Sequence, residues 1–369
     1  MPEQEALLKL KPQINISRPT AGRMWLVFFC ASLAVIQSAL SDSGASLVVA
    51  LTSLCCAVLT ELAITRAGYG FEKIRDGSAA ASAMVLALLL PNQIHPVYAG
   101  VGAVFAMAVV KHSFGGLGSN WVNPALGGWL FIRFSWSQAF SRALEHSPLT
   151  LVADTFENGV STARMPPLEL LKSAGAADFS GAGSAVDLAI SNFLNNTVFS
   201  LFGAELPSGY IGLLVLKSPG IIADRGVLAL ALGTIVITAF QISRAWVPAL
   251  YLGVFGLLVW LAGDMPFGGL PRNGDMLFAL FTGGTLAAAF ILIPEPASGA
   301  KSKPGMCAAA VLGAAVSFVF RYRSLEFYGC FFAAALINAL TPLIRSIEGR
   351  WLYSRKRQRR CPAPGGGAV

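Results

Sequence analysis

Apolar segments long enough to be membrane helices recur along this chain of 369 residues and constrain its fold more than any other feature. A helix needs about 20 apolar residues to cross a bilayer, and fewer where it is broken or covered by protein. Only 12% of the residues are charged, whereas an average soluble protein has about 25%. The sequence therefore predicts an all-α polytopic membrane protein with about ten transmembrane helices. They are expected at residues 24–40, 45–64, 78–91, 97–110, 124–134, 226–241, 247–262, 276–293, 306–320 and 327–344.

The positive charges between these segments predict how the chain crosses the membrane, because cytoplasmic loops are enriched in Lys and Arg. With the N-terminus in the cytoplasm, the loops at 65–77, 111–123 and 294–305 lie inside, and each carries Lys or Arg. The basic tail also lies inside, so both termini are predicted to be cytoplasmic. Arg321 and Arg323 do not follow this pattern, because they fall in a short outer loop.

A long polar stretch divides the apolar segments into two sets of five. The expected organisation is a cytoplasmic N-terminal segment (1–23), a first membrane repeat (24–134), an external loop (135–220), a second membrane repeat (221–345) and a basic cytoplasmic tail (346–369). Because an odd number of spans reverses the direction of the chain, the two halves have opposite membrane orientations. This is typical of inverted-topology repeats, which hold a ligand or ion near the midplane at broken helices.

The formal net charge of +8 is concentrated near the two ends of the chain. A basic run can bind nucleic acid, but beside apolar spans it is typical of cytoplasmic flanking charge. The expected partner is therefore the lipid bilayer, and not nucleic acid. The six cysteines show neither a CxxC pair nor the Cys/His spacing of a metal site, so we expect no metal.

One segment at a membrane boundary breaks the helical pattern. Residues 111–125 read KHSFGGLGSNWVNPA, which cannot continue a helix. Irregular backbone at membrane depth occurs only where it is buried in protein or lines a cavity. Pro124 suits the first turn of the next helix, with Asn123 as its cap. Free N–H groups there attract anionic or electron-rich groups, although a tight turn between two packed helices would explain the pattern equally well.

Two aspartates lie at corresponding places in the two halves, Asp76 before the third span and Asp224 before the sixth. Each can cap its helix by accepting backbone N–H groups. Alternatively, each can lie at the mouth of an ion path, because ionisable residues inside membranes usually mark function. For Asp224, pairing with the adjacent Arg225 is a further alternative. Glu61 is the one carboxylate well within the first four spans, where it can reach the interface or bind a partner.

The signatures of a self-contained enzyme are absent from the sequence. The three histidines, His95, His112 and His146, are far apart, which argues against a haem with two axial histidines. There is no Walker loop, nucleophile elbow or Rossmann fingerprint. The chain alone does not look like a complete enzyme.

The segment at 111–125 resembles the RnfD/NqrB family, whose members are membrane subunits of the Rnf electron-transport complex and of the sodium-pumping NADH:quinone reductase. Three further motifs agree in order with that family: DGS at 76–78 with LLLP at 88–91, FTGGT at 281–285 with PEPA at 294–297, and NALTPLI at 338–344. The resemblance covers about residues 20–345, and the length of the chain is closer to that of RnfD. The family pattern K-x-x-FGGxGxNxxNPA is matched by Lys111, Phe114, Gly115, Gly116, Gly118, Asn120, Asn123, Pro124 and Ala125.

The resemblance implies about ten helices in two inverted five-helix repeats, similar to urea transporters, with flavin as the electron carrier. It implies a multi-subunit complex in the bacterial inner membrane, with iron–sulfur subunits, that transfers electrons between ferredoxin and NAD while moving Na⁺ or H⁺. The choice of ion, the direction of electron flow and the presence of a second flavin such as riboflavin stay open. The implied flavin-binding positions in the glycine-rich segment are Lys111, Phe114, Gly115, Gly116, Gly118, Asn120 and Asn123.

The external loop departs from the family. Its members attach FMN through a phosphoester to the threonine of an S-x-A-T-P-L segment, and the comparable stretch here is STARMPPL at 161–168. Ser161 fits, but Arg164 occupies the acceptor position. FMN can be attached to the neighbouring Thr162, it can be held without a covalent bond by Arg164 pairing with its phosphate, or the site can be lost. A family glutamate at the start of the sixth span corresponds best to Asp224.

The main hypothesis is a flavin-binding membrane subunit of an ion-translocating oxidoreductase. One rival is a transporter or channel that uses the same inverted repeat to pass a small solute or ion without redox chemistry. Another is a scaffold that only holds partner subunits. The NqrB subunit of the sodium-pumping reductase is an alternative within the family.

Overall fold

The computed structural model consists of helices, and in the part of the chain that it describes there is no strand. A helix lies at each of the ten predicted segments. Four helices are long and apolar enough to cross a membrane: Thr20–Ser41, Ala45–Arg66, Lys303–Tyr322 and Gly329–Arg350. The described residues are 20–68, 76–116, 118–144, 182–197, 199–202, 209–210, 212–215, 220–240, 244–263, 271–272, 274–295, 298–300, 302–324, 326 and 328–360.

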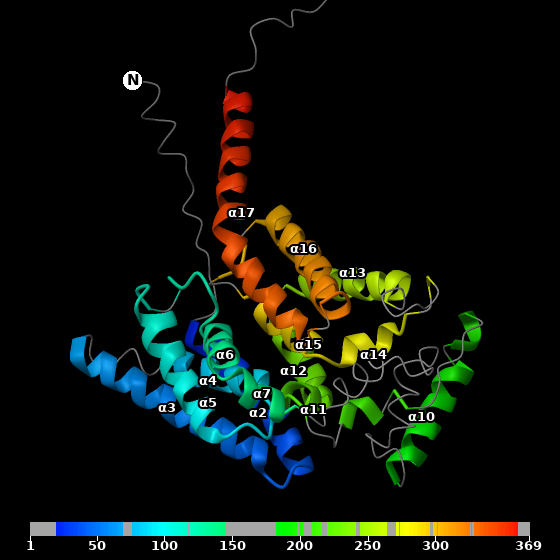
Figure 1. Ribbon diagram of the computed structural model, residues 1–369. Coiled ribbons are helices and arrows are strands. Elements are labelled where there is room, and N and C mark those ends of the chain that lie inside the picture. Colours follow the sequence, from blue (N-terminus) through cyan, green and yellow to red (C-terminus); the bar gives the residue numbers. More distant parts are fainter. Residues whose placement is uncertain are drawn as a thin grey trace, which may run out of the picture.

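The helices of the first half lie together, as the blue to teal ribbons of Figure 1 show. Two 3₁₀ turns, η3 (Phe199–Phe202) and η4 (Gly212–Val215), follow α10 (Ala182–Thr197) between the halves. The first half comprises α2 (Thr20–Ser41), α3 (Ala45–Gly68), α4 (Ser78–Leu89), α5 (Pro96–Phe105) with its π-helical continuation η2 (Ala106–His112), α6 (Pro124–Ser135) and α7 (Ser137–Arg142).

The second half forms the opposite side of the molecule, and its last helix extends beyond all the others (Figure 1). Its eighth predicted span is interrupted and consists of three short pieces. The second half comprises α11 (Ile222–Arg225), α12 (Val227–Ala239), α13 (Trp246–Ala262), α14 (Met276–Phe281), α15 (Thr285–Ala287), the π-helix η6 (Ala288–Leu292), α16 (Lys303–Tyr322) and α17 (Gly329–Arg360).

The centre of the first half is α4, which is buried on all sides. Eleven of its residues are buried, and most of those in its first two turns are alanines. A helix that is apolar all round belongs inside a bundle, and small side chains allow α2, α3 and α6 to pack closely around it. The helix ends where Leu90 adopts an extended conformation before Pro91, because a residue that precedes proline disfavours the helical region.

A short backbone pairing joins the two halves at the end of α4. Pro91 and Ile221 form an antiparallel bridge. The Asn92 N–H donates to Gly220 O at 2.9 Å, and the Ile222 N–H donates to Leu90 O at 3.0 Å. The Asn92 side chain accepts a further hydrogen bond from the Gly220 N–H at 3.2 Å. The end of the third predicted span and the start of the sixth are therefore fixed to each other.

Candidate functional site

The glycine-rich segment separates two helices, as the sequence predicts. The π-helix η2 ends at His112 and α6 begins at Pro124. Gly115, Gly116 and Gly118 have positive φ angles of 101°, 90° and 90°, a region that favours glycine. The Asn123 side chain caps α6 by accepting a hydrogen bond from the Ala125 N–H at 2.8 Å. The prediction of a capped helix start with proline in its first turn is confirmed.

A buried ion pair precedes this segment. Lys111 Nζ donates to Glu61 Oε1 at 2.8 Å and to Ser78 Oγ at 2.7 Å. The two charged side chains are only 2% and 3% exposed. Burial of this kind is tolerated when opposite charges are paired and hydrogen-bonded. Lys111 therefore joins three elements, η2, α3 and α4, and its ammonium already has two partners within the protein.

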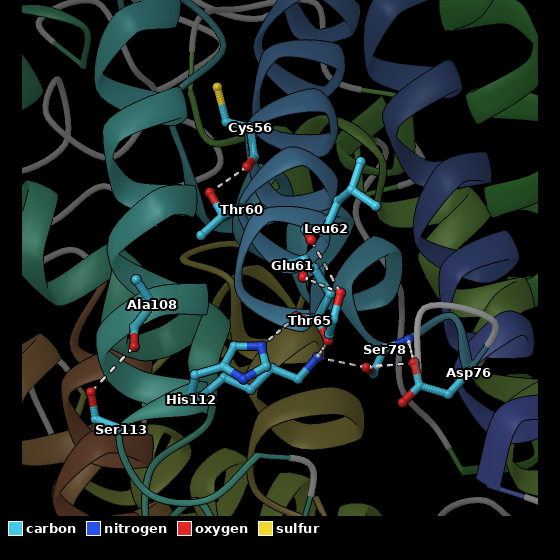
Figure 2. Close-up of polar contacts among 11 residues, drawn as sticks. Cys56, Thr60, Glu61, Leu62, Thr65, Asp76, Ser78, Ala108, His112 and Ser113 are labelled. Carbon is cyan, nitrogen blue, oxygen red and sulfur yellow. Dashed lines mark hydrogen bonds and ion pairs between the residues drawn. The ribbon is translucent and has the colours of Figure 1, made fainter. Parts of the chain in front are cut away.

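Two further side chains extend this cluster at its ends (Figure 2). His112 Nε2 lies 2.8 Å from the second oxygen of Glu61, so one carboxylate contacts two consecutive residues of the π-helix. At the other end, Ser78 Oγ donates to Asp76 Oδ1 at 2.7 Å, and Asp76 also accepts from the Ser78 N–H at 2.8 Å. Asp76 thus accepts the first backbone N–H of α4, as expected for a capping carboxylate, although Gly77 occupies the N-cap position itself. The role of Asp76 in an ion path stays a prediction.

Asn120 carries the unsatisfied polar atom of the glycine-rich segment. Its side chain is only 4% exposed, and among the described residues its Oδ1 has no hydrogen-bond partner. A buried amide oxygen without a donor costs free energy unless a water or ligand supplies one. Trp121 follows it in the chain, and the exposed rings of Trp121 and Phe114 meet edge to face with centroids 6.2 Å apart. This corner of the segment therefore contains a buried acceptor that has no donor among the described residues, and two exposed aromatic rings.

A carboxyl group from the second half lies against the same segment. Glu295 accepts a hydrogen bond from Ser298 Oγ at 2.7 Å, and the Asn123 side chain also bonds to it. Glu295 follows η6 and lies outside the helices. Burial raises the pKa of Glu295 from 4.5 to about 7, although the bonds from Ser298 and Asn123 act in the opposite direction. The sequence predicts only a rigid turn at Pro294-Glu295-Pro296, and not this contact.

Asp224 accepts backbone N–H groups, but from a different span than the sequence suggests. Its two carboxylate oxygens accept from the Gly283 N–H at 2.9 Å and from the Gly284 N–H at 2.7 Å. It therefore stabilises the start of α15 and not of its own helix. The adjacent Arg225 donates to Ser38 Oγ at 3.1 Å and lies 3.9 Å from Asp42. Whether Asp224 also belongs to an ion path stays a prediction.

Burial accounts for Arg321, one of the two exceptions to the charge pattern of the loops; Arg323, the other, is exposed. Arg321 lies in the last turn of α16 and is only 7% exposed. Its guanidinium donates to Ala279 O at 2.7 Å and to Thr282 O at 3.0 Å, at the end of α14. It is therefore a buried cation inside the protein and not a free loop charge subject to the positive-inside rule.

Lys111 and Arg321 make the same contact in the two halves. Each is a buried cation in the last turn of a helix, and each donates to a hydroxyl in the first turn of another helix. Lys111 contacts Ser78 at the start of α4, and Arg321 Nη1 contacts Thr285 at the start of α15, at 3.1 Å. A left-handed glycine precedes each hydroxyl, Gly77 with φ 71° and Gly284 with φ 67°.

The structure does not describe the external-loop residues that are expected to hold FMN. Thr162, Ser161 and Arg164 lie outside the described residues, so their role stays a prediction. Among the residues that the structure does describe, no group of three or more His, Cys, Asp or Glu side chains could hold a metal ion.

Comparison with known proteins identifies the family. A family model described as "NQR2, RnfD, RnfE family" matches residues 7–352. The chain belongs to this family. Its long apolar helices agree with that membership, and the protein is a membrane protein.

Curated relatives cover most of the chain, and each is the D subunit of an ion-translocating complex. The D subunit of the proton-translocating ferredoxin:NAD(+) oxidoreductase complex of Clostridium ljungdahlii is 26% identical to this chain over 335 residues. The match covers 90% of this chain and 91% of that subunit. That of the Na(+)-translocating complex of Acetobacterium woodii is 28% identical over 307 residues, 82% of each chain. That of an ion-translocating oxidoreductase complex of Alcanivorax borkumensis is 28% identical over 299 residues, 78% of each chain.

Proposed function

We propose that this chain is the RnfD membrane subunit of an Rnf-type complex that couples electron transfer between ferredoxin and NAD to the transport of Na⁺ or H⁺. Support comes from the family match and from relatives whose names describe such complexes. Those relatives include both a proton-translocating and a sodium-translocating complex, so the names do not select the ion. The partners are the other membrane and iron–sulfur subunits of the complex, and the location is the bacterial inner membrane with both termini in the cytoplasm.

The electron carrier that we propose is flavin. The observation that carries this proposal is the buried Asn120 Oδ1, which has no donor among the described residues. The ring system of a flavin offers an N–H for such an acceptor and a π-face for the exposed rings of Phe114 and Trp121. When bound, the flavin supplies a redox centre that takes and gives electrons. Asn120, Phe114 and Trp121 would hold and orient it, and the positive φ angles of Gly115, Gly116 and Gly118 give this segment its turns.

Charge favours a flavin without a phosphate at Asn120. The nearest buried cation along the chain is Lys111, and its ammonium is already held by Glu61 and Ser78. A phosphate there would meet an ammonium that is already paired, so we propose riboflavin for this corner. We propose FMN instead for the external loop, in the stretch that begins at Ser161. There it is attached to Thr162, or its phosphate pairs with Arg164.

The architecture that we propose has ten spans in two inverted repeats. The repeated contact of Lys111 with Ser78 and of Arg321 with Thr285 supports it, because the four residues lie at matching places of the two halves. The matching glycines, Gly77 and Gly284, support the same correspondence. An inverted repeat puts these two contacts on opposite sides of the membrane.

Flavin content tests the proposal. The purified full-length protein is expected to carry flavin. Denaturation releases flavin that is held without a covalent bond, and flavin attached to Thr162 stays on the polypeptide in a gel. Asn120→Ala should abolish most of the released flavin and leave the retained flavin unchanged, whereas Thr162→Ala should act in the opposite way if attachment is covalent. Asn192→Ala, at an exposed position on α10, is the matched control. A purified protein without flavin of either kind would contradict the proposal.

A further inference from the structure

The eighth predicted span is interrupted at Thr282, Gly283 and Gly284. Helix α14 ends at Phe281, and α15 begins at Thr285. Gly283 and Gly284 have φ angles of 69° and 67°, so the backbone turns through the left-handed region between the two helices. Such an interruption exposes carbonyl oxygens at the end of one helix and N–H groups at the start of the next. Both sets of groups need partners because the site is buried.

Four oxygen atoms at this interruption surround one cation. Arg321 Nη1 donates to Ala279 O at 2.7 Å, to Thr282 O at 3.0 Å and to Thr285 Oγ1 at 3.1 Å. Arg321 Nη2 donates to Thr282 Oγ1 at 2.6 Å. The two threonines are each only 1% exposed. The guanidinium therefore lies in a cage of two carbonyl and two hydroxyl oxygens, which we call the oxygen cage.

The opposite side of the interruption holds an anion. The Asp224 carboxylate accepts from both glycine N–H groups, and Arg321 attracts it electrostatically. The two side chains come from α11 and α16, so neither belongs to the interrupted span. Each charge meets the backbone groups that attract it, the carboxylate the glycine N–H groups and the guanidinium the carbonyl oxygens.

The ligands of the oxygen cage are those of a small monovalent cation. In transporters with broken helices, unwound carbonyls and half-helix C-termini coordinate Na⁺, and hard cations prefer oxygen ligands. We propose that the interruption between α14 and α15 is a cation site that the chain fills with its own guanidinium, so that the second half is closed to a translocated ion. The translocated cation then crosses elsewhere, outside this interruption, because Arg321 is covalently tethered and cannot leave.

A purely structural role for Arg321 would give different behaviour. An arginine that only satisfies helix carbonyls stabilises the fold, and its loss would destabilise the protein equally in every salt. A cation site, by contrast, binds a free cation when the tethered one is removed. A ligand that binds only the folded state raises its melting temperature with concentration. The dependence of the melting temperature on the type of cation therefore separates the two roles.

The experiment compares Arg321→Ala with wild type in detergent, using full-length protein. Arg323→Ala removes the same charge two residues away from an exposed position and is the matched control. Melting temperatures are measured in NaCl and in choline chloride at equal ionic strength. Wild type and Arg323→Ala should melt at the same temperature in both salts. Arg321→Ala should melt lower in choline and recover by several degrees in Na⁺. Equal melting of Arg321→Ala in the two salts would overturn the proposal.

Two further measurements keep the proposal testable if Arg321→Ala does not accumulate. Arg321→Gln removes the charge but keeps two hydrogen-bond donors. It should also melt higher in NaCl than in choline chloride, and equal melting in the two salts would overturn the proposal. The second measurement compares wild type with Asp224→Asn, each reconstituted in liposomes with radioactive Na⁺ outside. No uptake above protein-free liposomes is expected. Uptake that Asp224→Asn abolishes would place an ion path at the interruption and overturn the proposal, independently of whether the chain binds flavin.

Discussion

Lys111 Nζ lies 2.8 Å from Glu61 Oε1, and the two side chains form an ion pair that is almost completely buried between η2 and α3. The pair also fixes α4, because Lys111 donates to Ser78 in its first turn. Glu61 reaches His112 with its other oxygen. Glu61 therefore holds the helix end that precedes the glycine-rich segment, and Lys111 joins that helix end to the start of the central helix of the first half.

Removal of either member of this pair should be strongly destabilising. We expect Lys111→Met or Glu61→Gln to cost about 3–5 kcal/mol, because each leaves an uncompensated charge or unsatisfied group in the interior. The double variant should cost less than the sum of the two, since it removes both charges. Unfolding of the purified variants in denaturant would measure this.

The control for this prediction is the Arg133–Glu326 pair, whose side chains are 22% and 29% exposed. Partly exposed pairs contribute about 0–1 kcal/mol, so Glu326→Gln should be nearly neutral. Equal losses from Glu326→Gln and Glu61→Gln would show that burial does not set the strength of these pairs.

The glycines at the two helix interruptions should differ in their tolerance of a side chain. Gly284 has a positive φ, and a Cβ there would clash with the Phe331 ring. We expect Gly284→Ala to cost more than about 4 kcal/mol, because strain and steric overlap add. Gly116 also has a positive φ but has open space around a Cβ, so Gly116→Ala should cost only about 1 kcal/mol of backbone strain. Accumulation in the membrane and melting temperature would rank the two variants, and the reverse order would contradict this account.

Local patterns predicted the helices and their ends well. A helix lies at each predicted apolar segment, although four are long enough to cross a membrane and the eighth is interrupted. Asn123-Pro124 predicted the start and cap of α6, because capping depends on residues that are adjacent in the chain. The hydrogen bond from the first N–H of α4 to Asp76 could be predicted for the same reason, although Gly77 occupies the N-cap position.

Contacts between helices could not be predicted in this way. Asp224 reaches glycines 59 and 60 residues away, and Lys111 reaches a carboxylate 50 residues away, because helix packing sets these distances. A signal existed for Arg321, since it broke the loop-charge pattern. That pattern assumes solvated charges, and a basic residue that violates it at a span end is a candidate for a buried cation.

The stability of the protein should fall as pH rises through the titration of Glu295. Its pKa is raised from 4.5 to about 7 by burial, so the folded state holds the proton more tightly than the unfolded state does. The stabilisation of the folded state by the protonated Glu295 is fully present below about pH 4.5 and is lost as pH rises through about pH 7. Glu295→Gln mimics the protonated form, so its melting temperature should change less than that of wild type between about pH 5 and about pH 8.

The comparison of Glu295→Gln with wild type isolates this one carboxyl group from the rest of the protein. Glu326→Gln is the control, because the same chemical change at a partly exposed carboxylate paired with Arg133 should leave the pH profile like that of wild type. Since Asn123 bonds to Glu295, deprotonation should also alter the corner that includes Asn120. We therefore expect the released flavin of wild type, and not of Glu295→Gln, to vary over the same pH range. Parallel pH profiles for wild type and Glu295→Gln would show that this carboxyl group does not titrate in the window its burial predicts.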